Sequence, residues 1–201
     1  MSIFPYGQTE MQYLCRKDKK LGEVIVRIGK IEREVTPDVF AALVSSIVSQ
    51  QISNKAAATV WSRLNTRLGG VTPQSVMAAP QEDIQACGMS VRKAGYIKGI
   101  AQAVHSGALP LAQFPLMADA EIIKSLSALH GVGVWTAEML LLFSLLRPDI
   151  LSWGDLALRR GMMDLYGHKT LNKTRFERYR KRYSPYGSVA ALYLWELSHE
   201  K

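Results

Sequence analysis

Two glycines separated by one residue stand between two apolar stretches near the middle of the chain. The turn reads His130-Gly131-Val132-Gly133 and joins a stretch that ends near Leu129 to one that begins at Val134. Two glycines this close let the backbone turn tightly and leave its N–H groups uncovered by side chains. At the start of a following helix such N–H groups suit a phosphate. The pattern is also typical of an ordinary tight connection between helices, so alone it does not identify a phosphate site.

An aspartate follows this turn at a distance that one helix and a short loop would fill. Asp155 stands 22 residues after Gly133, directly before Leu156-Ala-Leu-Arg-Arg-Gly161. We expect it at the N-cap or in the first turn of a new helix, where most aspartates are plain caps. A cap position also keeps the carboxylate ionised. The aspartate and the turn together therefore indicate chemistry more strongly than either does alone.

The elements that must position these residues are helices. Helical periodicity runs through almost the whole chain and strand alternation is almost absent, so we predict an all-α protein of about ten helices. Ser53 and Ser90 are suited to cap helices, and Gly69-Gly70 and Gly107 to end them. Three further helices are expected over Thr36 to about Gln51, Asp119 to Leu129 and Val134 to Leu146.

Composition and patterning limit the class of protein. The 201 residues are 48% hydrophobic and 21% charged, as in a folded globule rather than a disordered chain. The longest apolar stretch, Met139 to Leu146, is too short to cross a bilayer. The first 25 residues contain no unbroken apolar core, so no signal peptide is visible and we expect a soluble intracellular protein.

Cysteine spacing and charge bear on cofactors and partners. Cys15 and Cys87 have no histidine or thiol neighbour at metal-ligand spacing, which argues against a zinc site or a cysteine-held iron–sulfur cluster. The formal net charge is +8, which favours a polyanionic partner. Nucleic acid leads, an acidic membrane surface comes second, and a soluble protein with a basic surface is the plain alternative.

Four motifs in order resemble the helix-hairpin-helix superfamily of base-excision DNA glycosylases, and within it the 3-methyladenine DNA glycosylase II branch. Besides the hairpin with Asp155, they are Ser46-Ile-Val-Ser-Gln-Gln-Ile-Ser53, Met89-Ser-Val-Arg-Lys-Ala-Gly-Tyr-Ile-Lys-Gly-Ile-Ala101 and Ser184-Pro-Tyr-Gly-Ser-Val-Ala-Ala-Leu-Tyr-Leu-Trp195. The resemblance implies two helical subdomains with the active-site cleft between them, in a compact form without the amino-terminal sheet domain of larger members. Within one catalytic unit over 1–201, we expect subdomains at roughly 36–147, with the hairpin, and at roughly 1–35 plus 148–201.

The resemblance also implies an activity and its residues. The enzyme would flip alkylated purines, of the 3-methyladenine or 7-methylguanine type, out of duplex DNA and hydrolyse the N-glycosidic bond, with Asp155 as catalytic carboxylate. Relatives that also cut the strand have a lysine two residues past the second hairpin glycine, where this chain has a tryptophan, so a monofunctional enzyme is expected. The expected base pocket comprises Trp135, Trp195, Trp153, Tyr193 and Tyr186, although packing in the core would also explain Trp195.

The remaining expectations concern DNA and ions. Gln51, supported by Gln50, matches the position that fills the vacated base stack, although both could simply cap helix ends. The basic run Lys173 to Arg182, with Lys98, would add nonspecific contacts or a solvated helix face. A monovalent cation on hairpin backbone carbonyls is implied, with no other cofactor and no iron–sulfur cluster. The phosphate contacts are expected at His130, Gly131, Gly133, Val134, Thr136, Arg92 and Lys93.

Some readings stay open, and two positions depart from the family pattern. The lesion could instead be uracil, an oxidised purine or a mismatched adenine, or the chain could be a DNA-binding module without activity. His130 replaces the usual proline and could add a pH-dependent phosphate contact, while Gly187 replaces a common arginine. A monomer without membrane contact is expected, in the prokaryotic cytoplasm near the nucleoid or in a eukaryotic nucleus.

Overall fold

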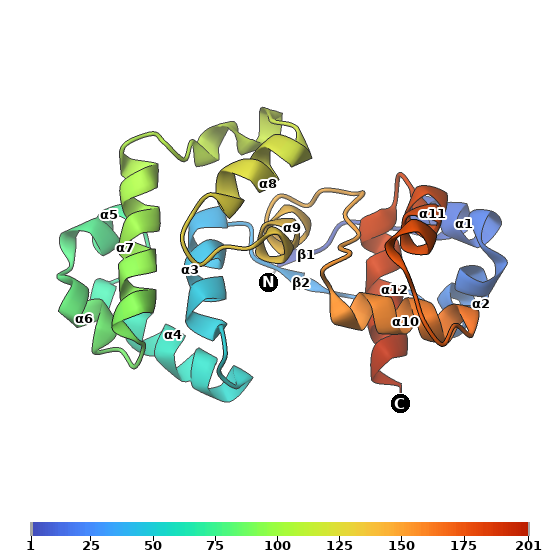
Figure 1. Cartoon of the computed structure of the whole chain (residues 1–201), viewed down its shortest axis with the longest axis horizontal. Helices are drawn as coiled ribbons and strands as arrows, with labels where there is room; N and C mark the ends of the chain where they lie inside the picture. Colours follow the sequence, from blue (N-terminus) through green and yellow to red (C-terminus); the bar gives the residue numbers. More distant parts are fainter. Residues whose placement is uncertain (1, 201) are drawn as a thin grey trace. The chain divides into compact units, whose positions relative to one another are not determined.

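The computed structural model describes residues 2–200, which are mostly helical (Figure 1). By the density of internal contacts the chain forms two compact units. We call Thr36–Leu140 the hairpin unit, and the described residues on both sides of it the terminal unit. The second boundary falls inside helix α9 (Val134–Phe143), rather than in the loop after it where the sequence suggested. Across residues 2–200, none of the helices combines the length and apolarity that crossing a membrane requires.

The hairpin unit is entirely helical and includes most of α9. Helix α7 packs against α3, α5 and α6, and α3 also packs against α4. The buried face of α3, which includes Leu43 and Ile47, and that of α7, which includes Ile97 and Ile100, supply much of the core. The remaining elements are α3 (Val39–Ser49), α4 (Asn54–Leu68), α5 (Pro73–Ala78), α6 (Gln81–Gln85), α7 (Val91–His105), a 3₁₀ helix η1 (Leu111–Leu116) and α8 (Asp119–Ser127).

Local capping explains most helix boundaries in this unit. The Ser53 hydroxyl accepts a hydrogen bond from the Ala56 N–H and the Ser90 hydroxyl from the Lys93 N–H, which confirms both predicted caps. The cap of α3 is Asp38 rather than Thr36, since its carboxylate accepts the Ala41 N–H. Helix α9 ends at Phe143, before the predicted Leu146, because Leu146 itself takes a φ of 56° and turns the chain.

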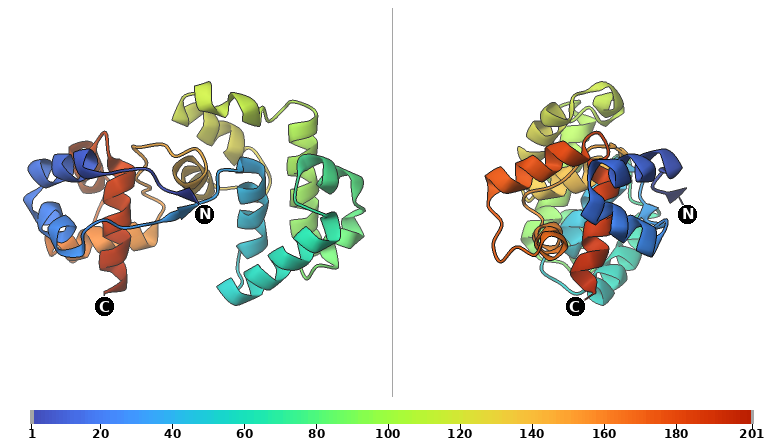
Figure 2. Two further views of the ribbon diagram at one scale, coloured as in Figure 1. Left: turned by 180° about the vertical axis from the view of Figure 1, so that it is seen from behind. Right: turned by 90° about the vertical axis from the view of Figure 1, so that its right-hand side faces the viewer.

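Helix α12 is the centre of the terminal unit, buried from Gly187 to Trp195. Helix α10 crosses it so closely that a Cβ on Gly161 would overlap the Leu194 carbonyl. A two-residue antiparallel pair, which the sequence did not predict, places Ser2 opposite Val35 (Figure 2). The elements are β1 (Ser2–Ile3), α1 (Gln8–Lys17), α2 (Lys19–Ile28), β2 (Glu34–Val35), α10 (Leu156–Tyr166), α11 (Lys173–Tyr183) and α12 (Gly187–His199).

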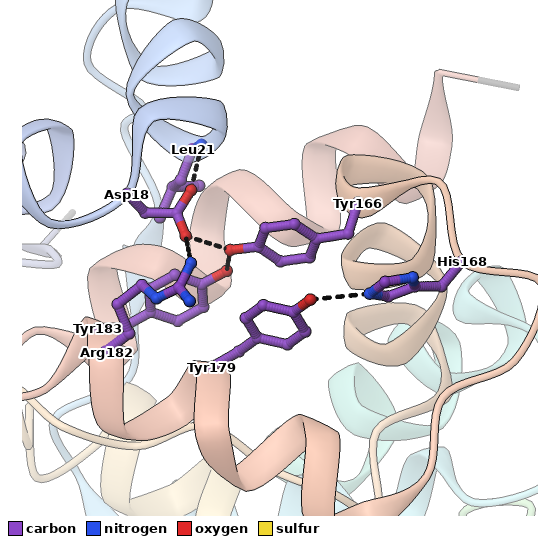
Figure 3. A network of polar contacts seen from close by, with 7 residues as sticks. All are labelled: Asp18, Leu21, Tyr166, His168, Tyr179, Arg182 and Tyr183. Carbon is purple, nitrogen blue, oxygen red and sulfur yellow. Dashed lines mark hydrogen bonds and ion pairs between the residues drawn. The ribbon is translucent and has the colours of Figure 1, made fainter.

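A polar network inside the terminal unit ties α2, α10 and α11 together (Figure 3). Asp18 caps α2 through the Leu21 N–H at 3.0 Å, and its other oxygen accepts the Tyr166 hydroxyl at 2.5 Å and Arg182 at 2.6 Å. The Tyr183 hydroxyl lies 2.7 Å from that of Tyr166. Burial alone would raise the pKa of Asp18, but these hydrogen bonds outweigh it and lower the pKa. The network therefore holds an ionised carboxylate inside the unit.

Candidate functional site

Asp155 caps helix α10 in the terminal unit. Its Oδ1 accepts a hydrogen bond from the Leu158 N–H at 2.9 Å, and the residue is 6% exposed. The partial positive charge at the helix start favours a negatively charged group there. The backbone N–H of Asp155 bonds to the Ser152 carbonyl at 3.4 Å, which ties the residue into the loop before the helix. The result is a carboxylate held in a fixed orientation and largely withdrawn from bulk water.

Two tryptophans of the terminal unit have aromatic neighbours. Trp153, two residues before Asp155, packs edge-on against Phe176 with ring centroids 5.3 Å apart, and the Arg159 guanidinium lies 4.8 Å from its ring centroid. Trp195, on α12, is 8% exposed and stacks on Phe143 with ring centroids 5.7 Å apart. Trp153 is thus part-exposed, whereas Trp195 lies mostly within the packing of α12 and the end of α9.

The two predicted tyrosines have mainly structural positions. Tyr193 is fully buried, and its hydroxyl donates to the Gly29 carbonyl at 2.9 Å. It therefore belongs to the core of the terminal unit rather than to a surface that a base could reach, because burial and the hydrogen bond account for it fully. Tyr186 precedes α12 and packs edge-on against Tyr13 at 5.1 Å between ring centroids. It is half-buried.

The predicted hairpin lies between α8 and α9 in the hairpin unit. Val132 is buried and its N–H bonds to the Leu129 carbonyl at 3.2 Å, which closes the turn. His130 is exposed and stacks on Tyr96 with ring centroids 6.2 Å apart. Val134 is 55% exposed and Trp135 is 49% exposed, so the start of α9 faces outward. Thr136 is buried, which makes it a poor phosphate contact, contrary to the sequence expectation.

The two hairpin glycines are glycines for different reasons. Gly131 has a φ of 85°, and a Cβ there would overlap the Tyr96 ring, so the fold itself requires glycine. Gly133 has no left-handed φ, and a Cβ there would meet nothing within 4 Å. The described chain thus gives no internal reason for glycine at 133. Glycine is also common where the backbone lies close to a ligand, and this is the reason that fits Gly133.

The loop from Gln50 to Ser53 joins α3 to α4 and contacts the hairpin. The Gln50 side-chain amide donates to the Gly131 carbonyl at 2.8 Å. Gln51 is exposed and has a φ of 57°, a left-handed conformation that is rare for residues other than glycine. The structure therefore brings Gln50 and the hairpin together and presents Gln51 to solvent.

The basic side chains divide into free and occupied ones. The Lys93 ammonium donates to the Val48 and Gln50 carbonyls at 2.8 and 2.6 Å, and burial lowers its pKa. The ammonium of Lys98 donates to the Val76, Met77 and Ala79 carbonyls. The phosphate role expected for these two lysines is therefore corrected: each ammonium is used to close the end of a helix. Arg92 remains exposed.

Helix α11 shows the same division. Arg182 is bound to Asp18, and Arg180 donates to Glu177 at 2.7 Å. The other basic residues of the helix are exposed and have no ion pair among the described residues; they are Lys173, Arg175, Arg178 and Lys181. Helix α11 therefore does present an exposed basic surface, but fewer residues contribute to it than the sequence of the helix suggests.

Sequence reasoning missed the partner that explains Gly187. Asp149 accepts the Gly187 N–H at 3.0 Å and the Ser184 hydroxyl at 2.5 Å, and so caps the start of α12. A Cβ on Gly187 would lie 2.7 Å from the Asp149 carboxylate, which leaves no room for an arginine. The glycine at a position where relatives commonly have an arginine was the sequence signal that could have indicated this contact.

Residues 2–200 contain no cluster of three or more His, Cys, Asp or Glu side chains arranged to hold a metal.

Comparison with known proteins yields consistent relatives. The Schizosaccharomyces pombe protein DNA-3-methyladenine glycosylase 1 is 33% identical over 164 residues, which cover 79% of this chain and 72% of that protein. A crystal structure of a DNA-3-methyladenine glycosidase from Bacillus halodurans has a TM-score of 0.89 at 35% identity and covers 100% of this chain and 94% of its own. The structure of the S. pombe 3-methyladenine DNA glycosylase in complex with abasic DNA has a TM-score of 0.81 at 28% identity, over 94% of this chain and 96% of its own.

A family match agrees with these relatives and includes most of the hairpin unit and part of the terminal unit. Residues 44–185 match the family described as HhH-GPD superfamily base excision DNA repair protein. The matched range contains the loop with Gln51, the hairpin and Asp155. The all-α helix-hairpin-helix fold expected from the sequence is thereby confirmed. This chain belongs to the HhH-GPD superfamily of base excision DNA repair proteins.

Proposed function

We propose that the chain is a monofunctional DNA glycosylase that binds duplex DNA, flips out an alkylated purine and hydrolyses its N-glycosidic bond, leaving an abasic site. The observation that carries this proposal is the buried, capped Asp155 in a chain whose relatives are named DNA-3-methyladenine glycosylases. The chain acts as a monomer, and in the cell it works where the DNA is, in a prokaryotic cytoplasm or a eukaryotic nucleus.

Asp155 has the properties that this reaction requires. Cleavage of the N-glycosidic bond places positive charge on the sugar, and a fixed carboxylate lowers the energy of that charge. The Leu158 N–H and the α10 helix start keep Asp155 oriented, so little reorganisation is needed as the charge develops. A purine alkylated at a ring nitrogen already carries positive charge and leaves easily. A second carboxylate as general acid is therefore not required.

Trp135 supports the monofunctional assignment and the preference for a cationic base. It stands where strand-cutting relatives have their lysine nucleophile, and an indole cannot form a Schiff base. Trp135 is 49% exposed, so part of the side chain lies at the protein surface. A cation over an indole face gains about 0.5 to 2 kcal/mol, which favours an alkylated purine over a neutral one.

The hairpin supplies the contact with the DNA strand. Residues 133–135 at the start of α9 are exposed, and backbone N–H groups at a helix start, with no side chain on Gly133, suit a phosphate. Gln51 enters the base stack and fills the space left by the flipped nucleotide. Its exposed side chain and left-handed backbone support this role, since strained residues cluster at functional sites.

A monovalent cation on the hairpin carbonyls is part of the proposal. The Gly131 carbonyl accepts from Gln50 and the Leu129 carbonyl from Val132, but each oxygen keeps a second lone pair, so the residues fit such an ion. The ion would add positive charge beside a DNA phosphate. DNA affinity at constant ionic strength should then be higher in sodium or potassium than in tetramethylammonium, and equal affinities would contradict the ion's presence.

Base release from methylated DNA tests the activity directly. Purified protein should liberate 3-methyladenine and 7-methylguanine from methylated duplex at neutral pH, as read by chromatography, and leave the strand intact until alkali is added. Parallel duplexes with uracil, 8-oxoguanine or a mismatched adenine identify another lesion if one is preferred. Release of none of these bases would overturn the proposal, and a covalent DNA complex trapped by borohydride would overturn the monofunctional part.

A further inference from the structure

The end of α3 is held by a lysine from a distant part of the chain. Lys93, in the first turn of α7, donates to the Val48 and Gln50 carbonyls, 45 and 43 residues earlier. Carbonyls at a helix end lack intrahelical donors and carry partial negative charge, so an ammonium is a favourable partner. At 2.6 Å, the bond to Gln50 is short enough to restrict rotation of that carbonyl.

The restricted carbonyl belongs to the peptide unit that joins Gln50 to Gln51. Rotation of this unit changes ψ of Gln50, here 130°, together with φ of Gln51, here 57°. A left-handed φ costs a non-glycine residue about 1 kcal/mol or more, so this conformation persists only when its surroundings impose it. The bond from Lys93 to the Gln50 oxygen fixes the direction of that carbonyl and therefore restricts rotation of the peptide unit.

The side chain of Gln50 provides a second attachment, to the hairpin. Its amide donates to the Gly131 carbonyl at 2.8 Å, and Gly131 itself packs against Tyr96, three residues after Lys93 on α7. The loop, the hairpin and α7 therefore form one connected set of contacts within the hairpin unit. Gln51 is the exposed residue at its tip.

We propose that Lys93 is a positioning residue that sets the conformation of Gln51 through the Gln50 carbonyl, so that the Gln51 side chain is ready to enter the base stack. The inference rests on the proposed function for its consequence in catalysis, but its structural part stands without DNA. Lys93 acts through another residue and does not itself need to touch a phosphate, because both of its observed partners are carbonyls.

Lys98 offers a matched control on the same helix. Its ammonium closes the end of α5 by donating to three carbonyls, and it is half-buried like Lys93. The chain beyond α5 continues through Ala79 with an ordinary φ of −73°. Lys98→Met therefore removes the same kind of capping interaction without touching Gln51, whereas Lys93→Met removes it at the loop and Lys93→Arg restores a cation.

The first measurement uses the protein without DNA. Backbone ¹⁵N order parameters of residues 50–52 should fall from values typical of rigid backbone, about 0.85, to below about 0.6 in Lys93→Met, and stay rigid in Lys98→Met. Lys93→Arg should recover most of the rigidity. If the amide spectrum shows that Lys93→Met is folded and its order parameters are unchanged, the proposal is overturned, whatever the activity of the protein.

The second measurement follows base flipping with 2-aminopurine beside the lesion. Lys93→Met should slow flipping about tenfold, the effect of losing one charge-assisted hydrogen bond, while Lys98→Met should not. In a Gln51→Ala background the added effect of Lys93→Met should fall below about twofold, because both act through one side chain. Additive effects, with a salt dependence of DNA affinity reduced by about one unit, would show that Lys93 contacts a phosphate directly and would overturn the proposal.

Failure of the two proposals is distinguishable. If the wild-type chain releases no base but residues 50–52 loosen in Lys93→Met, the proposed function is wrong and the hold of Lys93 on the loop stands. If base is released and the loop stays rigid in Lys93→Met, the function stands and the role of Lys93 is wrong.

Discussion

The two units expose different kinds of residue at their candidate functional positions. In the hairpin unit, Gln51, Val134 and Trp135 are exposed, and the segments that present them are held by bonds to backbone carbonyls. In the terminal unit, Asp155 is nearly buried at a helix start, and a second capping aspartate, Asp18, is fixed by a tyrosine and an arginine.

The difference matches two physical tasks. A grip on a DNA strand needs N–H groups and side chains that reach out of the protein, because the phosphates and bases lie outside it. A carboxylate that stabilises a cationic transition state needs a fixed position away from water, where its charge is least screened. On the proposed function, the exposed hairpin of one unit would grip the strand, and the nearly buried Asp155 of the other would stabilise the transition state.

Asp155→Asn is the largest expected effect and tests this division directly. Asparagine caps a helix as well as aspartate does, so Tm should change little, while the loss of charge should slow single-turnover excision by at least about 100-fold. Affinity for abasic DNA, measured by fluorescence anisotropy, should stay near wild type because the substitution leaves the exposed hairpin and the exposed basic residues of α11 unchanged. Excision at the wild-type rate would remove Asp155 from the mechanism.

Substitutions at the two hairpin glycines separate folding from binding within the hairpin unit. Gly131→Ala should destabilise the protein by about 2 to 4 kcal/mol, since its Cβ would overlap Tyr96 at a strained φ. Gly133→Ala should leave the free energy of unfolding within about 0.5 kcal/mol of wild type. It should nevertheless weaken binding to abasic DNA about threefold to tenfold, by keeping a phosphate away from the backbone. Unfolding by urea and DNA titration measure the two effects, and unchanged DNA affinity in Gly133→Ala would argue against a close phosphate.

Asp18→Asn tests whether the second buried aspartate of the terminal unit is purely structural. The variant keeps the cap but loses the ion pair with Arg182 and the negative charge that accepts the Tyr166 hydroxyl, which should cost about 1 to 3 kcal/mol and lower Tm by about 3 to 10 °C. Excision per folded molecule should be unchanged. A large loss of activity without a loss of stability would mean that the two capping aspartates are not as different as the structure indicates.

The pH dependence of this variant follows from the lowered pKa of Asp18. A carboxyl whose pKa is lower in the folded than in the unfolded state adds stability above its unfolded pKa, near 3.8, and that stability is lost as pH falls through the folded pKa. The Tm difference between wild type and Asp18→Asn should therefore be constant from pH 7 to about 5 and shrink below about pH 4. Calorimetry across this range checks it, and a difference that grows in acid would contradict the assigned charge.

Gln51→Gly has a small expected effect on stability, and it is the one substitution here that should stabilise the protein. Glycine removes the cost of the left-handed φ, so the protein should gain up to about 1 kcal/mol, while base flipping slows because the side chain is gone. Gln51→Ala should slow flipping without that gain. A glycine variant that flips at the wild-type rate would show that the exposed loop has no wedge function.

Local signals in the sequence predicted a large part of this molecule. The caps Ser53 and Ser90, the glycine that ends α4 and the hairpin between α8 and α9 all lie where the pattern indicated. Each depends on neighbours within a few residues, so the chain order alone carries the information. The N-cap position of Asp155 belongs to the same class.

Contacts between distant residues could not be predicted in this way. Lys93 and Arg182 looked like members of a basic surface, yet one closes α3 and the other pairs with Asp18, 164 residues away. Tyr193 matches a pocket position by its motif, but its burial and its bond to Gly29 make it a core residue. The residue type of a charged or aromatic side chain does not show whether it is solvated or bound, because its neighbours in the folded protein determine that.

The order of residues was enough to define the helices, the tight glycine turn and the acidic cap after it, since helix starts, ends and turns follow from backbone sterics and hydrogen bonds made within a few positions. Folding decided which of the 25 basic side chains remain exposed, why Gly131 but not Gly133 is required internally, and how Gln51 is held at a strained φ. Those outcomes depend on burial and on partners brought from elsewhere in the chain, and neither exists before the helices pack.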